Sequence, residues 1–316
     1  MKNFNKTSML IIALLGVGSF VPLLLDDYWI HVAIIGLFYV IMASSWNLLA
    51  GYTGQVSFAH AAFAGIGAYI SGILSIYLNI SPMITILIGS AIAAILGFGL
   101  GFLCLRMGGI YLSLTTLGFS EIVRLIITNE YEITRGTMGL EVPSLLGFYS
   151  KTSYYYIMFA VAILVIIFLN KLVKSDLGLA FKSVLNDELA ASSCGVDTIR
   201  VRVVAFTISS SIAGLAGGLY GHYLLLITPD IPSLGQMFMV LAMTIIGGMG
   251  TLSGPVIGAL FLQVLSEYIR VFGKIHLLLF GLIALLVARF APEGIVGLFK
   301  TVFKTKNLLK FLKQAQ

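Results

Sequence analysis

The sequence predicts an all-α polytopic membrane protein, and three observations indicate that fold class. Of its 316 residues, 59% are hydrophobic and only 10% are charged, whereas a soluble domain carries about 25% charged residues. The mean hydropathy is +1.03. The apolar residues fall into long runs, and about 20 apolar residues suffice for a helix to cross the roughly 30 Å hydrocarbon core. We therefore expect a bundle of transmembrane helices, one or more of them broken at glycines.

Ten apolar segments have the length of such helices. They cover residues 8–25, 30–49, 57–79, 83–105, 110–129, 154–172, 203–227, 234–249, 254–271 and 275–290. The first follows a basic start and could be a signal peptide, but no small-x-small cleavage site follows it, so we expect a span. Together these segments predict one transmembrane domain over residues 1–299 and a basic tail over 300–316.

Basic residues in the predicted connections are concentrated on one side of the membrane, which by the positive-inside rule is the cytoplasmic side. On that side lie Lys2, Lys6, Arg106, Lys171, Lys174, Lys182, Arg200, Arg202, Arg289 and the tail lysines, against Arg135, Lys151, Arg270 and Lys274 on the other. Both termini are therefore expected in the cytoplasm. A basic tail beside anionic lipid accounts for the net charge of +6, so no nucleic-acid partner is expected.

A polar, glycine-containing stretch, GYTGQVSFAHAAFAG (residues 51–65), interrupts the apolar runs. Non-helical backbone at membrane depth is tolerated only where protein buries it or where it lines an aqueous cavity, and discontinuous helices recur in transporters. We expect a broken segment near a translocation path, formed by Gly51, Gly54, Gln55, Ser57, His60 and Gly65. The alternative is that its polar side chains only join helices by hydrogen bonds, with His60 a packing residue.

A second glycine-rich stretch, IIGGMGTLSGP (residues 245–255), allows two interpretations. Glycines four residues apart let helices approach closely in lipid. Alternatively the helix breaks there, because glycine weakens a helix and proline lacks a donor. The residues of this possible break are Gly247, Gly248, Gly250, Gly254 and Pro255.

Two polar connections are long enough to meet other proteins. Residues 130–153 form a predicted external loop, too long for a tight turn between helices. Residues 174–202 form the longest predicted cytoplasmic connection, where apolar residues recur at intervals of three to four. That spacing predicts a short amphipathic helix.

The sequence shows no motif for catalysis or for nucleotide binding. It lacks GxxxxGK[ST], HExxH and GxSxG, so we expect no catalytic residue, no metal and no cofactor bound by this chain. Glu121 and Arg124 lie three residues apart on one predicted helix face, as a self-compensating pair. Because few other acidic residues lie within the spans, coupling to protons or sodium is disfavoured. No function is assigned to Cys104 or Cys194.

Four blocks of the sequence resemble a known family. NLLAGYTGQVSFAHAAFAGIGAY (residues 47–69) resembles the signature of the permease subunits of bacterial ABC importers for branched-chain amino acids, of the LivM kind. Residues 106–126, 181–221 and 243–262 resemble the corresponding blocks in the same order. The sister LivH kind shares the first and last blocks but lacks the long form of the second block, which contains LSLTTLGFSEIVR in this sequence.

The resemblance implies a multi-pass subunit of the bacterial inner membrane, surrounded by lipid. It implies a second, LivH-like permease, two cytoplasmic ATPase subunits that use ATP, and a periplasmic binding protein that delivers leucine, isoleucine or valine. Substrate would cross by alternating access. Related permeases carry urea, short amides or other amino acids, so the substrate stays open, as does a stand-alone secondary carrier.

The resemblance also implies roles for residues in both connections. ABC importer permeases carry a coupling helix marked by Ala-Ala, three residues and then Gly, which Ala190, Ala191 and Gly195 match here. Of the acidic residues before it, Asp187 and Glu188, the latter stands one place earlier than the usual acidic position. Glu130, Glu132 and Arg135 of the external loop would help to dock the binding protein.

Overall fold

The computed structural model describes residues 16, 18–22, 25–104, 107, 109–147, 150–270, 281–282, 289 and 294–297. Most of the predicted spans 8–25 and 275–290 lie outside the described residues, as do Lys2, Lys6, Arg106, Lys274 and the tail over 300–316.

Six helices in the described part are long and apolar enough to cross a membrane. They are α2 (Asp27–Thr53), α3 (His60–Tyr77), α4 (Pro82–Leu103), α5 (Ile110–Asn129), α7 (Lys151–Lys174) and α10 (Thr198–Leu224). Two shorter apolar helices follow, α11 (Leu234–Gly247) and α12 (Ser253–Ile269). These eight coincide with eight of the ten predicted segments, but ten spans are not confirmed.

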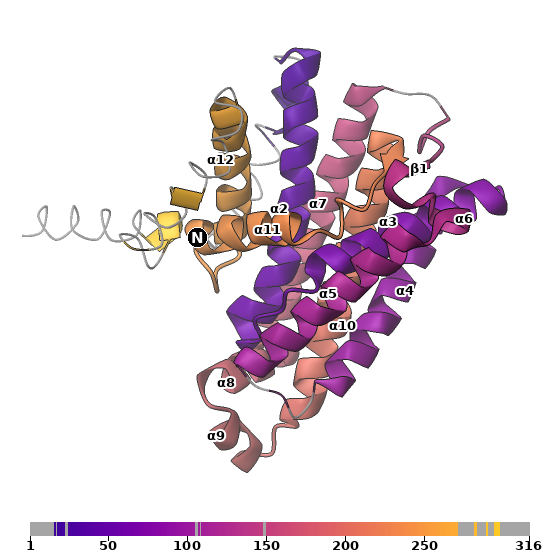
Figure 1. Cartoon of the computed structure of the whole chain (residues 1–316). Helices are drawn as coiled ribbons and strands as arrows, with labels where there is room; N and C mark the ends of the chain where they lie inside the picture. The colour runs from indigo at the N-terminus through magenta and orange to yellow at the C-terminus, as the bar shows by residue number, and fades with distance from the viewer. Residues whose placement is uncertain are drawn as a thin grey trace, which may run out of the picture.

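The two short helices have different directions. With 14 residues, α11 is about 21 Å long at 1.5 Å per residue, well short of the hydrocarbon core. Figure 1 shows α11 lying crosswise to α2, whereas α12 runs beside the upper half of α2. The sequence prediction of an ordinary span at 234–249 is therefore not confirmed, because the helix ends at Gly247 and is shorter than the six long apolar helices.

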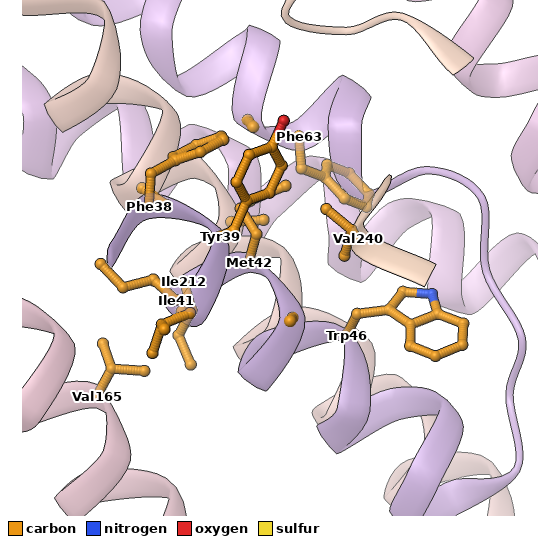
Figure 2. Close-up of a cluster of buried hydrophobic side chains, with 14 of the residues drawn as sticks. Phe38, Tyr39, Ile41, Met42, Trp46, Phe63, Val165, Ile212 and Val240 are labelled. Atoms are coloured by element: carbon orange, nitrogen blue, oxygen red, sulfur yellow. The ribbon is translucent and has the colours of Figure 1, made fainter. Parts of the chain in front are cut away.

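Helix α2 forms the centre of the molecule, since 89% of its most apolar window is buried. Around its Phe38, Ile41 and Met42, Figure 2 shows side chains from other helices, among them Phe63 of α3 and Val240 of α11. Helices α4 and α5 are peripheral, with 39% and 22% of their windows buried. Their exposed apolar side chains are those expected of a surface in contact with lipid.

Helices α3, α4 and α10 pack through small residues. A Cβ atom at Gly67 would collide with the carbonyl oxygen of Gly214 on α10, and one at Gly217 would collide with that of Ala64 on α3. A Cβ at Gly89 of α4 would lie 2.6 Å from the carbonyl oxygen of Gly67. The backbones are thus in direct contact, which is how helices associate closely in lipid.

The predicted external loop is folded. It contains α6 (Tyr131–Thr134), the 3₁₀ helix η1 (Gly136–Met138) and strand β1 (Leu140–Glu141). Strand β1 pairs antiparallel with β2 (Leu226–Ile227), with Leu140 opposite Ile227. This pairing fixes the loop to the connection that follows α10.

The predicted cytoplasmic connection contains a short amphipathic helix, α8 (Asp176–Asn186), as expected, and a second helix, α9 (Glu188–Ser193), that was not expected. Asp187 separates them because its backbone is extended, with φ −160° and ψ 112°, and its carboxylate accepts a hydrogen bond from the Ala190 amide at 3.0 Å. An acidic side chain is a favourable cap for a new helix. The sequence pattern did not reveal this restart.

Candidate functional site

The first glycine-rich stretch contains a complete interruption of helical structure. Helix α2 ends at Thr53, Gly54 takes a left-handed conformation with φ +73°, and α3 begins only at His60. A left-handed residue of this kind favours glycine because it has no Cβ.

The non-helical segment 54–59 runs back along α2. The Trp46 indole Nε1 donates to the Ser57 carbonyl at 2.8 Å, and the Gln55 amide donates to the Leu49 carbonyl at 3.2 Å. Trp46 lies about two turns before the end of α2. The chain between α2 and α3 is therefore held against the last two turns of α2.

His60 is fully buried at the start of α3 and is hydrogen-bonded to another helix. Its Nε2 contacts the Ser209 hydroxyl of α10, and that hydroxyl donates to the Ser45 carbonyl at 3.0 Å. Since a hydroxyl has one proton to donate, Ser209 accepts from Nε2–H, which assigns the His60 tautomer. Nδ1 is then a buried acceptor without a partner among the described residues. His60 thus joins α2, α3 and α10.

The second stretch is also interrupted. Helix α11 ends at Gly247, Gly248 and Gly250 have φ values of +122° and +76°, and α12 begins at Ser253. A Cβ at Gly247 would collide with the carbonyl oxygen of Gly254. The two interpretations of this stretch therefore both hold, since the chain breaks and the two helices still pack closely through glycine.

Asn47 of α2 connects the two interruptions. Its Oδ1 accepts from the Gly250 amide and its Nδ2 donates to the Thr251 carbonyl, both at 2.8 Å. Next to it, a Cβ at Gly51 would lie 2.6 Å from the Gly250 nitrogen. The structure thus brings together two glycine-rich stretches that lie 200 residues apart in sequence. Sequence reasoning missed Asn47, although an asparagine one turn before Gly51 in an apolar helix was the available signal.

The joint at Asn47 is closed in this chain. A cavity of about 10 Å³ lies beside it, lined by residues that include Ser44, Tyr52 and Pro255. That volume holds one water at most. Gly65 lies apart from this joint, because a Cβ there would lie 2.8 Å from Pro232, in the connection between β2 and α11.

The cytoplasmic connection touches the first interruption. A Cβ at Gly54 would lie 3.2 Å from Leu185 Cδ1 of α8. On α9, Glu188 forms an ion pair with Arg202 of α10, and the Arg202 side chain is mostly buried. Ala191 is buried and Ala190 is exposed, whereas Leu189 is 79% exposed.

Gly195, between α9 and α10, has φ +86°, a conformation that favours glycine. Far from it, in the folded external loop, Glu130, Glu132 and Arg135 are all exposed. They do not approach the joint at Asn47. Within the described ranges, no three side chains of the metal-ligating types are grouped.

Comparison with known proteins identifies relatives along nearly the whole chain. The LivM permease protein of the high-affinity branched-chain amino acid transport system of Escherichia coli is 29% identical, covering 96% of this chain and 78% of that protein. The probable LivM permease of Methanocaldococcus jannaschii is 24% identical over 83% of this chain and 90% of that protein. The LivH permease of Salmonella typhimurium is 26% identical over 83% of this chain and 92% of its own length.

No solved structure matches this chain significantly. The family described as "Branched-chain amino acid transport system / permease component" matches residues 28–288, a range that contains both interruptions, Asn47 and the cytoplasmic connection. The chain belongs to this permease family.

Proposed function

We propose that this chain is a transmembrane permease subunit of an ABC importer for leucine, isoleucine and valine. The observation that carries the proposal is the family match over residues 28–288 together with the LivM relative along 96% of the chain. A LivH-like permease, two ATPases that hydrolyse ATP, and a periplasmic binding protein complete the importer. The chain lies in the bacterial inner membrane with both termini in the cytoplasm, and its ten predicted apolar segments form the membrane domain.

The conformational change of the ATPase subunits reaches this chain through α8 and α9. Their exposed leucines, Leu185 and Leu189, offer an apolar surface to a groove on an ATPase. Leu185 lies beside Gly54, where α2 gives way to the segment 54–59, since a Cβ at Gly54 would be 3.2 Å from its Cδ1. The ion pair between Glu188 and Arg202 ties the same connection to α10. Movement of an ATPase is thereby passed to the start of the first interruption and to α10.

The path opens at the two interruptions. Short non-helical segments can change conformation at little cost, whereas a continuous helix would have to break its hydrogen bonds. Asn47 holds the segments together in the closed arrangement, and exchange of its two hydrogen bonds would let α12 separate from α2. On the external side, the exposed charges at Glu130, Glu132 and Arg135 form part of the surface for the loaded binding protein.

The test is ATP-dependent uptake of labelled leucine by cells that lack this chain. They receive the wild-type chain, a double variant that carries both Ala190→Trp and Gly195→Trp, or a control variant. The control is Ser192→Ala, because the exposed Ser192 hydroxyl donates a hydrogen bond to the Leu189 carbonyl of the same helix, α9. Wild type and control should restore uptake, while the double variant reaches the membrane but does not transport.

Two results would contradict the proposal. Normal uptake by the double variant would refute the coupling role of α9. If wild type fails to restore leucine uptake, the substrate assignment falls, and labelled urea and a short amide show whether a related importer is present. Uptake by this chain alone in vesicles without ATP would instead indicate a secondary carrier.

A further inference from the structure

A polar stripe runs along one flank of α5. It consists of Ser113, Ser120, Glu121, Arg124 and Thr128, which we call the α5 flank, and Leu117 is an apolar residue on the same arc. At 100° per residue these positions fall within an arc of about 100° along four turns of the helix. Ile122 and Ile126 point away from this arc and are strongly exposed, as expected for a lipid-facing surface.

The ion pair in the α5 flank is not shielded by the rest of the chain. Arg124 forms two hydrogen bonds from Nε to the Glu121 carboxylate, at 3.0 and 3.1 Å, and a third from its Nη2. Each of the two side chains is 34% exposed. Both lie well inside a helix with the length and composition of a membrane span. Charges at that depth are found facing water or polar protein rather than lipid.

The α5 flank is continuous with the first interruption. The Ser113 hydroxyl donates to the Val56 carbonyl at 2.9 Å, and the Phe58 amide donates to the Thr116 hydroxyl at 2.9 Å. Thr116 lies beside the flank on the buried side of α5. The segment 54–59 is therefore hydrogen-bonded to one end of the polar stripe.

A further observation points to a ligand at the stripe. Ser120 is fully buried, and its hydroxyl has no hydrogen-bond partner among the described residues. The outer half of the stripe thus offers a guanidinium, a carboxylate and an unused hydroxyl.

We propose that the α5 flank lines the aqueous translocation path, and that Glu121 and Arg124 bind the head group of a zwitterionic amino acid. The α-ammonium of the substrate would meet the carboxylate of Glu121, and its α-carboxylate would meet the guanidinium of Arg124. One ion pair is then replaced by two, so no charge is left without a partner. Urea is neutral and would form no ion pair with either side chain. This inference rests on the proposed function and names its substrate contacts.

The test compares leucine uptake by the whole importer containing wild-type chain or the double variant Glu121→Gln, Arg124→Gln. Removing both charges leaves no uncompensated ion, so assembly should persist. We expect uptake to fall by about ten- to hundredfold, the value of a charge-assisted contact. The control is Glu267→Gln, Arg270→Gln, an ion pair with the same spacing at the end of α12, which should transport as wild type does.

A reversed pair separates binding from a structural role. The variant Glu121→Arg, Arg124→Glu keeps an ion pair of the same spacing on α5 but exchanges the positions of its charges. We expect it to assemble and to lose leucine uptake. Normal uptake by this variant or by the double glutamine variant would overturn the head-group site.

Accessibility tests the path itself. In a Cys194→Ser background, Leu117→Cys and Thr128→Cys on the arc should react with a membrane-impermeant thiol reagent, whereas Ile122→Cys and Ile126→Cys should not. Equal reactivity of the two sets would refute an aqueous flank. A wild-type importer that takes up a neutral amide but no zwitterion would overturn both the head-group site and the proposed substrate. Leucine uptake unaffected by the α5 variants would overturn this inference alone.

Discussion

Replacing Asn47 should loosen the joint between the two interruptions. The side chain is 2% exposed and makes two hydrogen bonds of 2.8 Å to the backbone of Gly250 and Thr251. Asn47→Ala removes both hydrogen bonds, at about 0.5–1.5 kcal/mol each, since Gly250 is exposed and Thr251 is half-buried. The variant should therefore be about 1–3 kcal/mol less stable, with a fall in Tm of about 2–6 °C for a chain of this size.

The Asn47→Asp variant makes the prediction more specific. Aspartate can still accept from the Gly250 amide, but it places a second acceptor against the Thr251 carbonyl, where asparagine donates. We expect it to be at least as unstable as Asn47→Ala, although it is closer in shape to asparagine. Both variants should also transport leucine poorly, because α12 is no longer held against α2.

The assay is thermal unfolding of the purified importer in detergent, together with leucine uptake in cells. The control is Asn129→Ala, since Asn129 is exposed and donates only to the Leu125 carbonyl of its own helix. A Tm for Asn47→Ala equal to that of the control would refute the proposed joint. So would an Asn47→Asp variant as stable as wild type.

Three other features give direct predictions. Gly217→Val should lower the yield and the Tm of the importer, because even a Cβ at this position collides with the α3 backbone. Overpacking of this kind destabilises a protein by about 1–3 kcal/mol. Gly99→Ala is the control and should change neither quantity, because a Cβ at Gly99 meets open space. Glu188→Gln should leave the mostly buried Arg202 guanidinium of α10 without its carboxylate partner. The stimulation of ATP hydrolysis by loaded binding protein should therefore be weaker than in wild type. Unchanged stimulation would refute the coupling role of this ion pair. Cys194 is exposed and should react rapidly with maleimide at neutral pH, whereas Cys104 is buried and should react slowly. Equal rates would contradict this.

The sequence by itself determined the fold class and most of the helix positions. Long apolar runs can be stable only where lipid or protein surrounds them, and their lengths mark the helices. It also indicated both interruptions, because Gly54 and Gly250 adopt left-handed backbone conformations that favour glycine whatever surrounds them. The ion pair between Glu121 and Arg124 was predictable for the same reason, since three residues along a helix fix their separation.

Only the tertiary structure decided which parts of the chain meet. Asn47 and Gly250 are joined, and His60 contacts Ser209, through the packing of helices that are far apart in sequence. No local pattern encodes such contacts, because they depend on how helix faces fit together. The crosswise course of α11 has the same origin. Hydrophobicity specifies that a segment is buried, but the close contact of particular surfaces specifies what it is buried against.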